Sequence, residues 1–233
     1  GLLKPTQGTV IVNEMRIGKS SKDLKPLRQQ VGLVFQYPEQ QLFEETVGKD
    51  IAYGPKNLGL SGEDIDFRVK EAAELVGLPF EEVKDRSPFE LSGGQRRRVA
   101  IAGVLAMHPT ILILDEPTAG LDPRGRDEVL NGIRVLHEKN GYTIILVSHS
   151  MEDIARLVDR IVVMNKGRVV LTGSPREIFT HAEELESMGL GVPQITRLMK
   201  ALRQKGMDVP VDIYTVEQAK EALIKVLGEK RHA

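Results

Sequence analysis

Apolar residues recur along this chain with two different periods. Short runs of β-branched and aliphatic residues, closed by polar turns, predict strands, and they lie at residues 9–12, 30–35, 111–114, 143–147 and 161–164. Helical segments near residues 126–139 and 151–157 separate the later runs. Because strands alternating with helices are typical of a parallel sheet with covering helices, the sequence predicts an α/β fold.

A second period, of three to four residues, predicts helices between about residues 38 and 107. One helix is expected over residues 66–76, where Gly77 is suited to end it, and another over residues 93–107. These predicted helices lie between two predicted strands.

The final part of the chain is again amphipathic. A short strand is expected at residues 168–171, and helices are expected beyond Ser174. The last of them, residues 215–227, begins with Thr215 and Gln218 at the spacing of a capping box. We therefore expect a small helical appendage after the sheet.

Composition narrows the class of protein. The chain has 233 residues, which is enough for one α/β domain with a modest appendage. Its 32 Lys and Arg nearly balance its 33 Asp and Glu, so no global field attracts nucleic acid or anionic lipid. It has no cysteine, which excludes disulfides and thiolate metal sites. Its longest apolar runs have the length of strands, far below the roughly 20 residues that span a bilayer.

Two adjacent carboxylates, Asp115 and Glu116, follow the aliphatic run Ile111–Leu114. In an open α/β sheet, ligands bind beyond the carboxyl ends of the strands. One carboxylate there can hold Mg²⁺ while its neighbour orients or deprotonates an attacking water. The alternative is a strand that ends in solvated acids before Pro117.

A glycine turn opens the predicted helix at residues 93–107. The stretch Ser92-Gly93-Gly94-Gln95 has capping-box spacing, so it is a well-formed helix start. The same N–H groups and positive helix end attract phosphate, and both interpretations hold together. The run Arg96–Arg98 adds positive charge, although such a run is more often a solvated face.

Two polar residues follow other predicted strands. Gln36 comes directly after the run at residues 30–35, and His149 comes after Ser148 and the run at residues 143–147. At a strand's carboxyl end an imidazole can donate to a γ-phosphate oxygen. Taken singly, each residue is more often structural, for example as a hydrogen-bond donor to a turn.

In order and spacing, five segments of this chain resemble the motifs of the nucleotide-binding subunits of ABC transporters. They correspond to that family's Q-loop, signature motif, Walker B strand, D-loop and switch histidine, and they are Gln36, Leu91–Gln95, Ile111–Glu116, Ala119–Asp122 and His149. The resemblance covers Gly1 to about Pro175. It implies a P-loop NTPase-like (RecA-like), mostly parallel sheet in an ATPase domain at residues 1–175, with an inserted α-helical subdomain at about 38–107. Residues 176–233 would form a helical C-terminal extension.

The resemblance also implies the ligands, ATP and Mg²⁺, and the role of each residue. Mg²⁺ would be held by Asp115 and Gln36, and Glu116 would act on the attacking water. His149 and Gln36 would sense the γ-phosphate. Asp122 would communicate across a dimer. The signature residues would bind the nucleotide of the opposite subunit, and they are Ser92, Gly93, Gly94 and Gln95.

A closer resemblance appears in residues 35–47 and at Gly54-Pro55. These segments look like the A-prime ATPases of energy-coupling-factor (ECF) importers for vitamins and for cobalt or nickel. The resemblance implies a second ABC ATPase, a membrane T subunit and a separate S subunit for the solute, with this chain at the cytoplasmic face of the membrane. The expected T-subunit contacts are Gln36, Glu39, Leu42, Phe43, Glu44 and Glu45.

The N-terminal part departs from this family. Residues Asn13–Ser20 imitate the spacing of a phosphate loop, but the first glycine is replaced and turn-like residues 21–26 follow. We therefore expect residues 13–20 to be no phosphate loop and the sequence to be truncated before Gly1. On that hypothesis the chain alone has negligible ATP turnover, while its signature motif can still complete a partner's site.

Two other functions remain open at this stage. A soluble ABC ATPase acting on nucleic acid usually has a coiled-coil insertion or two cassettes, and this chain has neither. A degenerate subunit would lend only its signature motif to a partner. Intact Asp115, Glu116 and His149 argue against such decay.

Overall fold

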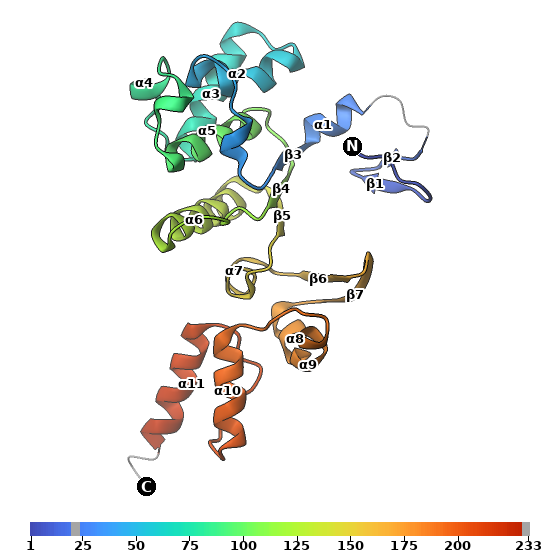
Figure 1. Ribbon diagram of the computed structural model, residues 1–233, viewed down its shortest axis with the longest axis vertical. Helices are drawn as coiled ribbons and strands as arrows, with labels where there is room; N and C mark the ends of the chain where they lie inside the picture. Colours follow the sequence, from blue (N-terminus) through green and yellow to red (C-terminus); the bar gives the residue numbers. More distant parts are fainter. Residues whose placement is uncertain (20–23, 230–233) are drawn as a thin grey trace. The chain divides into compact units, whose positions relative to one another are not determined.

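The computed structural model describes residues 1–19 and 24–229, and its contacts divide the chain into two compact units, Gly1–Val147 and Ser148–Ala233 (Figure 1). The first unit contains β1 (Val10–Val12), β2 (Met15–Ile17), α1 (Lys25–Gln30), β3 (Val31–Val34), η1 (Pro38–Gln41), α2 (Val47–Leu58), α3 (Gly62–Leu75), α4 (Phe80–Val83), η2 (Pro88–Glu90), α5 (Gly93–Leu105), β4 (Ile111–Asp115), α6 (Pro123–Asn140) and β5 (Thr143–Val147). The second contains α7 (Met151–Leu157), β6 (Ile161–Asn165), β7 (Arg168–Gly173), α8 (Pro175–Thr180), α9 (Ala182–Ser187), α10 (Gln194–Gln204) and α11 (Val216–Glu229).

The centre of the first unit is a parallel sheet with strand order β3-β4-β5. Val34 pairs with Leu114, and Asp115 pairs with Val147, so the carboxyl ends of the three strands form one edge. One face packs closely on α5, because a Cβ placed on Gly32 would come within 2.7 Å of Val104 Cγ1. The predicted α/β fold with a parallel sheet is confirmed.

A short antiparallel hairpin, β1 and β2, begins the chain. Its turn consists of Asn13 and Glu14, both in the left-handed region with φ of 44° and 66°, as a tight hairpin turn requires. Residues 13–19 therefore form a turn and a strand rather than a phosphate loop, as expected; Ser20 lies outside the described residues. The sequence analysis missed β2 and α1, which begins at Lys25 within the stretch expected to be turn-like.

Helices α2 to α5 form the inserted helical layer of the first unit (Figure 1). Each long helix begins at a hydroxyl cap: Thr46, Ser61 and Ser92 accept the N–H of the third residue of α2, α3 and α5. Fully buried Ile51 and Val99 belong to the core of this layer. The predicted helix at residues 66–76 starts earlier, at Gly62, because the Ser61 cap sets its first turn.

In the second unit, β6 pairs with β7 in an antiparallel two-stranded sheet. The turn Lys166-Gly167 connects them, with φ of 48° and 76°. The interpretation that residues 161–164 continue the parallel alternation is wrong for the described pairing, because this tight turn reverses the chain onto β6. Buried residues of α7, β6, α8 and α9 form one core around Ile178, Phe179 and Leu185.

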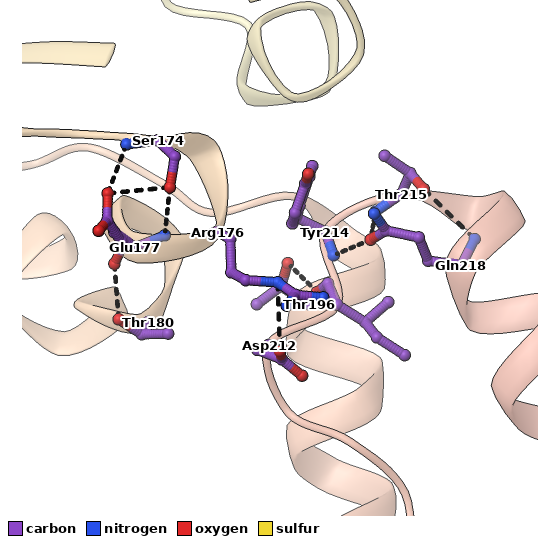
Figure 2. A network of polar contacts seen from close by, with 10 residues as sticks. Ser174, Arg176, Glu177, Thr180, Thr196, Asp212, Tyr214, Thr215 and Gln218 are labelled. Atoms are coloured by element: carbon purple, nitrogen blue, oxygen red, sulfur yellow. Dashed lines mark hydrogen bonds and ion pairs between the residues drawn. The ribbon is translucent and has the colours of Figure 1, made fainter. Parts of the chain in front are cut away.

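The last two helices pack on each other around a second small core that contains Met199 and Val209. Figure 2 shows the polar contacts beside it: Thr196 Oγ1 donates to the Ile213 carbonyl at 2.8 Å, and Arg176 pairs with Asp212 at 3.3 Å. The predicted capping box is confirmed, since the Gln218 N–H donates to Thr215 Oγ1 at 3.3 Å. The expected domain boundary at residue 175 stays a prediction. Across the described part of the chain, every helix is too short or too polar to cross a bilayer.

Candidate nucleotide site

The candidate site lies at the carboxyl edge of the parallel sheet. Gln36 follows β3 by two residues, Asp115 ends β4, and Glu116 follows it. Because Val34 is paired with Leu114 in a parallel register, Gln36 and the two acids leave the sheet at the same edge. The structure therefore brings together three of the predicted site residues within the first unit.

Glu116 has an unusual backbone conformation. Its φ is 47°, in a region that non-glycine residues seldom adopt. Its N–H donates to the Val147 carbonyl at 2.9 Å, and its carbonyl accepts the Ala119 N–H at 3.0 Å. Strained residues of this kind persist only where surrounding contacts fix them, and they concentrate at functional sites. Glu116 is half-buried rather than enclosed in the apolar core.

The oxygen donors at this edge fit a magnesium ion. Asp115 is half-buried at the end of β4, and Gln36 is exposed. Mg²⁺ prefers hard oxygen ligands and usually binds one or two carboxylates together with substrate phosphates. Asp115 and the amide oxygen of Gln36 match that donor set.

The signature segment forms an open helix start. The Gln95 N–H donates to Ser92 Oγ at 3.3 Å, and the Ser92 N–H donates to Gln95 Oε1 at 3.1 Å, so the capping box is confirmed. Ser92, Gly93 and Gly94 are exposed, and a Cβ on either glycine would meet nothing within 4 Å. A phosphate can thus approach the N–H groups of the first turn of α5, where the helix end is positive.

Asp122 has a clear local role. It is the N-cap of α6, where its Oδ1 accepts the Gly125 N–H at 2.7 Å, and its side chain is exposed. Its expected part in communication across a dimer stays a prediction.

His149 belongs to the second unit and is exposed. It lies between Ser148 and Ser150, whose N–H donates to Ser148 Oγ at 3.1 Å. Ser150 also caps α7. The contact of His149 with a γ-phosphate stays a prediction.

Arg97 is a residue that sequence reasoning misjudged. The Arg96–Arg98 run was interpreted as a solvated face, but Arg97 is buried, with 3% of its surface exposed. Its Nη1 donates to the Ala119 carbonyl at 3.2 Å and its Nη2 donates to the Pro117 carbonyl. Burial lowers the pKa of Arg97, while the charge of Glu39 opposes that effect. No feature of the Arg96–Arg98 run distinguishes the buried member from its neighbours.

The expected membrane-subunit contacts lie along η1 and the segment that follows. Phe43 is 59% exposed and meets Tyr53, 45% exposed, edge to face with ring centroids 4.8 Å apart. Glu45 is exposed and pairs with Lys49 at 2.6 Å, and Glu44 is half-buried. One expectation needs correction, because Leu42 is a core residue with 5% of its surface exposed. Glu39 is half-buried with a buried Oε2, and its expected contact stays a prediction.

The fold and the site together define an α/β protein of the P-loop NTPase class: carboxylates end a central parallel strand, and a capped glycine turn opens a helix in the same unit. The family model described as ABC transporter matches residues 1–119. The chain belongs to the ABC transporter family, as an ATP-binding subunit.

Curated relatives align with nearly the whole length of this chain. The energy-coupling factor transporter ATP-binding protein EcfA2 of Clostridium perfringens is 58% identical, over 97% of this chain and 80% of the relative. The protein of that name from Caldanaerobacter subterraneus is 60% identical, over 97% of this chain and 79% of the relative.

Two solved structures are similar to this chain in sequence and in fold. CbiO1 from Clostridium perfringens, part of the ABC transporter complex CbiONQ, is 40% identical with a TM-score of 0.70, over 86% of this chain and 79% of that chain. The ATP-binding cassette MJ0796, solved as a dimer in a post-hydrolysis state with ADP and phosphate, is 29% identical with a TM-score of 0.63, over 75% of this chain and 76% of that chain.

Proposed function

We propose that this chain is the ATP-binding and ATP-hydrolysing subunit of an ECF-type importer, acting at the cytoplasmic face of the membrane. The observation that carries the proposal is the edge of the sheet where Asp115, Glu116 and Gln36 meet, in a chain 58% identical to an EcfA2 protein. The solute is a vitamin or a transition-metal ion such as cobalt or nickel, bound by a separate S subunit.

In the proposed reaction, Asp115 and Gln36 would hold Mg²⁺, which would neutralise charge on the phosphates. Glu116 orients the attacking water and accepts its proton, while the γ-phosphoryl group is transferred to that water's oxygen and ADP leaves. His149 donates a hydrogen bond to a γ-phosphate oxygen. Preorganised hydrogen-bond donors of this kind make the largest contribution to the rate enhancement of many enzymes.

The signature residues act on another subunit's nucleotide. Ser92 Oγ and the N–H of Gly94 are exposed at the start of α5, so they can close on phosphate from across an interface. Asp122 lies beside that interface in the proposed pair. The partner is a second ABC ATPase, either a related A subunit or another copy of this chain.

The decisive variant is Glu116→Gln, measured in the full-length protein assembled with its partner ATPase and membrane subunits. Loss of a general base typically costs 10²- to 10⁴-fold in rate, so ATP hydrolysis should fall by at least about 100-fold while ATP binding persists. Glu138→Gln, an exposed glutamate on α6, is the matched control and should hydrolyse normally. Equal hydrolysis by the Glu116 variant and the control would refute the proposal.

We also propose that the T subunit binds the exposed aromatic pair Phe43 and Tyr53 with Glu44 and Glu45 beside it. An amphipathic partner helix carrying arginine suits this apolar, acidic surface.

Reversing both charges, Glu44→Lys with Glu45→Lys, should weaken co-purification with the T subunit. Glu82→Lys with Asp85→Lys reverses two exposed charges elsewhere in the helical layer, and this pair of substitutions should leave co-purification with the T subunit unchanged. If both pairs of substitutions co-purify alike, the surface is not the docking site.

A further inference from the structure

A buried arginine joins the signature helix to the turn that follows the catalytic carboxylate. Arg97 extends from α5, and both of its terminal nitrogens donate to this turn, to the carbonyls of Pro117 and Ala119. Pro117 is the residue directly after Glu116. The guanidinium therefore fixes the chain within one residue of the group that acts on water.

The turn needs such support because Glu116 is held in the left-handed region, with φ of 47°. A conformation of this kind costs free energy and persists where neighbouring contacts determine it. On one side the Glu116 N–H is held by the Val147 carbonyl. On the other side the Glu116 carbonyl accepts the Ala119 N–H. Arg97 adds hydrogen bonds to the Pro117 and Ala119 carbonyls there, and hydrogen bonds from a charged donor are stronger than neutral ones.

The segment after β3 reaches the same place. Glu39 Oε2 and Arg97 Nε are both buried and, among the described residues, both lack a hydrogen-bond partner. The charge of Glu39 acts on Arg97, since it raises the pKa that burial lowers. Tyr37 also contacts the turn, because a Cβ on Gly120 would lie 3.3 Å from Tyr37 Cε1.

We infer that Arg97 is a positioning residue for Glu116. The inference rests on the proposed function. Arg97 is buried and donates to carbonyls of the turn, so it acts through the carboxylate that the turn presents.

The test is the kinetics of ATP hydrolysis by the assembled transporter. With Arg97→Gln we expect kcat to fall about 10- to 100-fold, since a small misplacement of a catalytic group has an effect of that size. The KM for ATP should change less than about twofold, because the Arg97 guanidinium is buried and donates to backbone carbonyls of the turn. Arg97→Lys keeps the charge but not the planar fork, so it should recover only part of kcat.

Arg68→Gln is the matched control. Arg68 is half-buried in the same unit and donates to the Met107 carbonyl, 3.4 Å away and remote from the turn. Its kcat should stay within about twofold of the unmodified chain. If Arg97→Gln has the same kcat as this control, the inference is wrong.

Arg97→Lys remains informative if Arg97→Gln fails to fold, because it keeps the buried charge and loses only the planar fork. A kcat of Arg97→Lys equal to that of Arg68→Gln would overturn the inference. Failure of Glu116→Gln to reduce hydrolysis would instead refute the proposed function, so the two failures are distinguishable.

Discussion

Ser92 has two roles that one substitution separates. Its Oγ accepts the Gln95 N–H at 3.3 Å and so caps α5, and the same exposed oxygen is proposed to face a partner's phosphate. Asp is as good an N-cap as Ser, whereas Ala costs about 1 kcal/mol at such a position. Ser92→Asp therefore keeps the helix start and places a negative charge where phosphate is proposed to bind.

The size of the effect follows from Coulomb's law. Two unit charges about 4 Å apart interact by about 4 kcal/mol at an effective dielectric constant of 20. Since each 1.4 kcal/mol is a factor of ten, Ser92→Asp should weaken ATP-dependent pairing by about 1,000-fold. The helix start should remain, so hydrogen exchange at the Gln95 amide should be as slow as in the unmodified chain.

Pairing is best measured by analytical ultracentrifugation with and without ATP, in the Glu116→Gln background that holds the nucleotide. Thr215→Asp is the matched control, because Thr215 begins α11 with the same kind of capping box and its Gln218 N–H is also 3.3 Å away. The control should pair normally. If Ser92→Asp pairs as tightly as Thr215→Asp, Ser92 is a helix cap and nothing more.

Two further predictions concern stability. Gly32→Val should lower the melting temperature, because even its Cβ would lie 2.7 Å from Val104 Cγ1 and overpacking typically costs about 1–3 kcal/mol. Adding Val104→Ala should restore part of the lost stability. An unchanged melting temperature in Gly32→Val would contradict the close packing at this position. The Ser174 N–H and hydroxyl lower the pKa of Glu177 below its ordinary 4.5, so this contribution is present at neutral pH and is lost as the pH falls through the lowered pKa. Hydrogen exchange in α8, corrected for intrinsic rates, should accelerate as the pH falls through the lowered pKa of Glu177. The acceleration should be smaller in Glu177→Gln than in the unmodified chain.

The parallel sheet and the polar residues at its carboxyl edge were predictable because local signals agree with the final structure. The run at residues 111–114 is strand-forming and alternates between half-buried and buried residues, and Asp115 follows it as the last strand residue. The glycine turn at Ser92 shows its cap in its own spacing. Such signals depend on residues that are neighbours in the sequence, so one amino-acid sequence is enough to recognise them.

The remaining features depend on partners distant in sequence. Whether Arg97 is buried is decided by carbonyls 20 and 22 residues away, which no local pattern shows. Whether β6 pairs with an earlier strand or with β7 depends on a tight turn at Lys166-Gly167 that reverses the chain. Strand β1 was predicted from its run of β-branched residues, whereas β2, Met15–Ile17, has only one β-branched residue and was missed.

The arrangement of the first unit argues for action between subunits. Its acids and Gln36 leave the sheet at one edge, where a nucleotide of the same chain would present its phosphates. Its capped glycine turn is open to solvent, with nothing within 4 Å of where a Cβ on Gly94 would lie. Arg97 ties this helix to the turn beside Glu116. On the proposed function, a partner's phosphate bound at the start of α5 would act on the helix whose Arg97 holds the turn beside Glu116, so closure on one nucleotide would be coupled to hydrolysis of another.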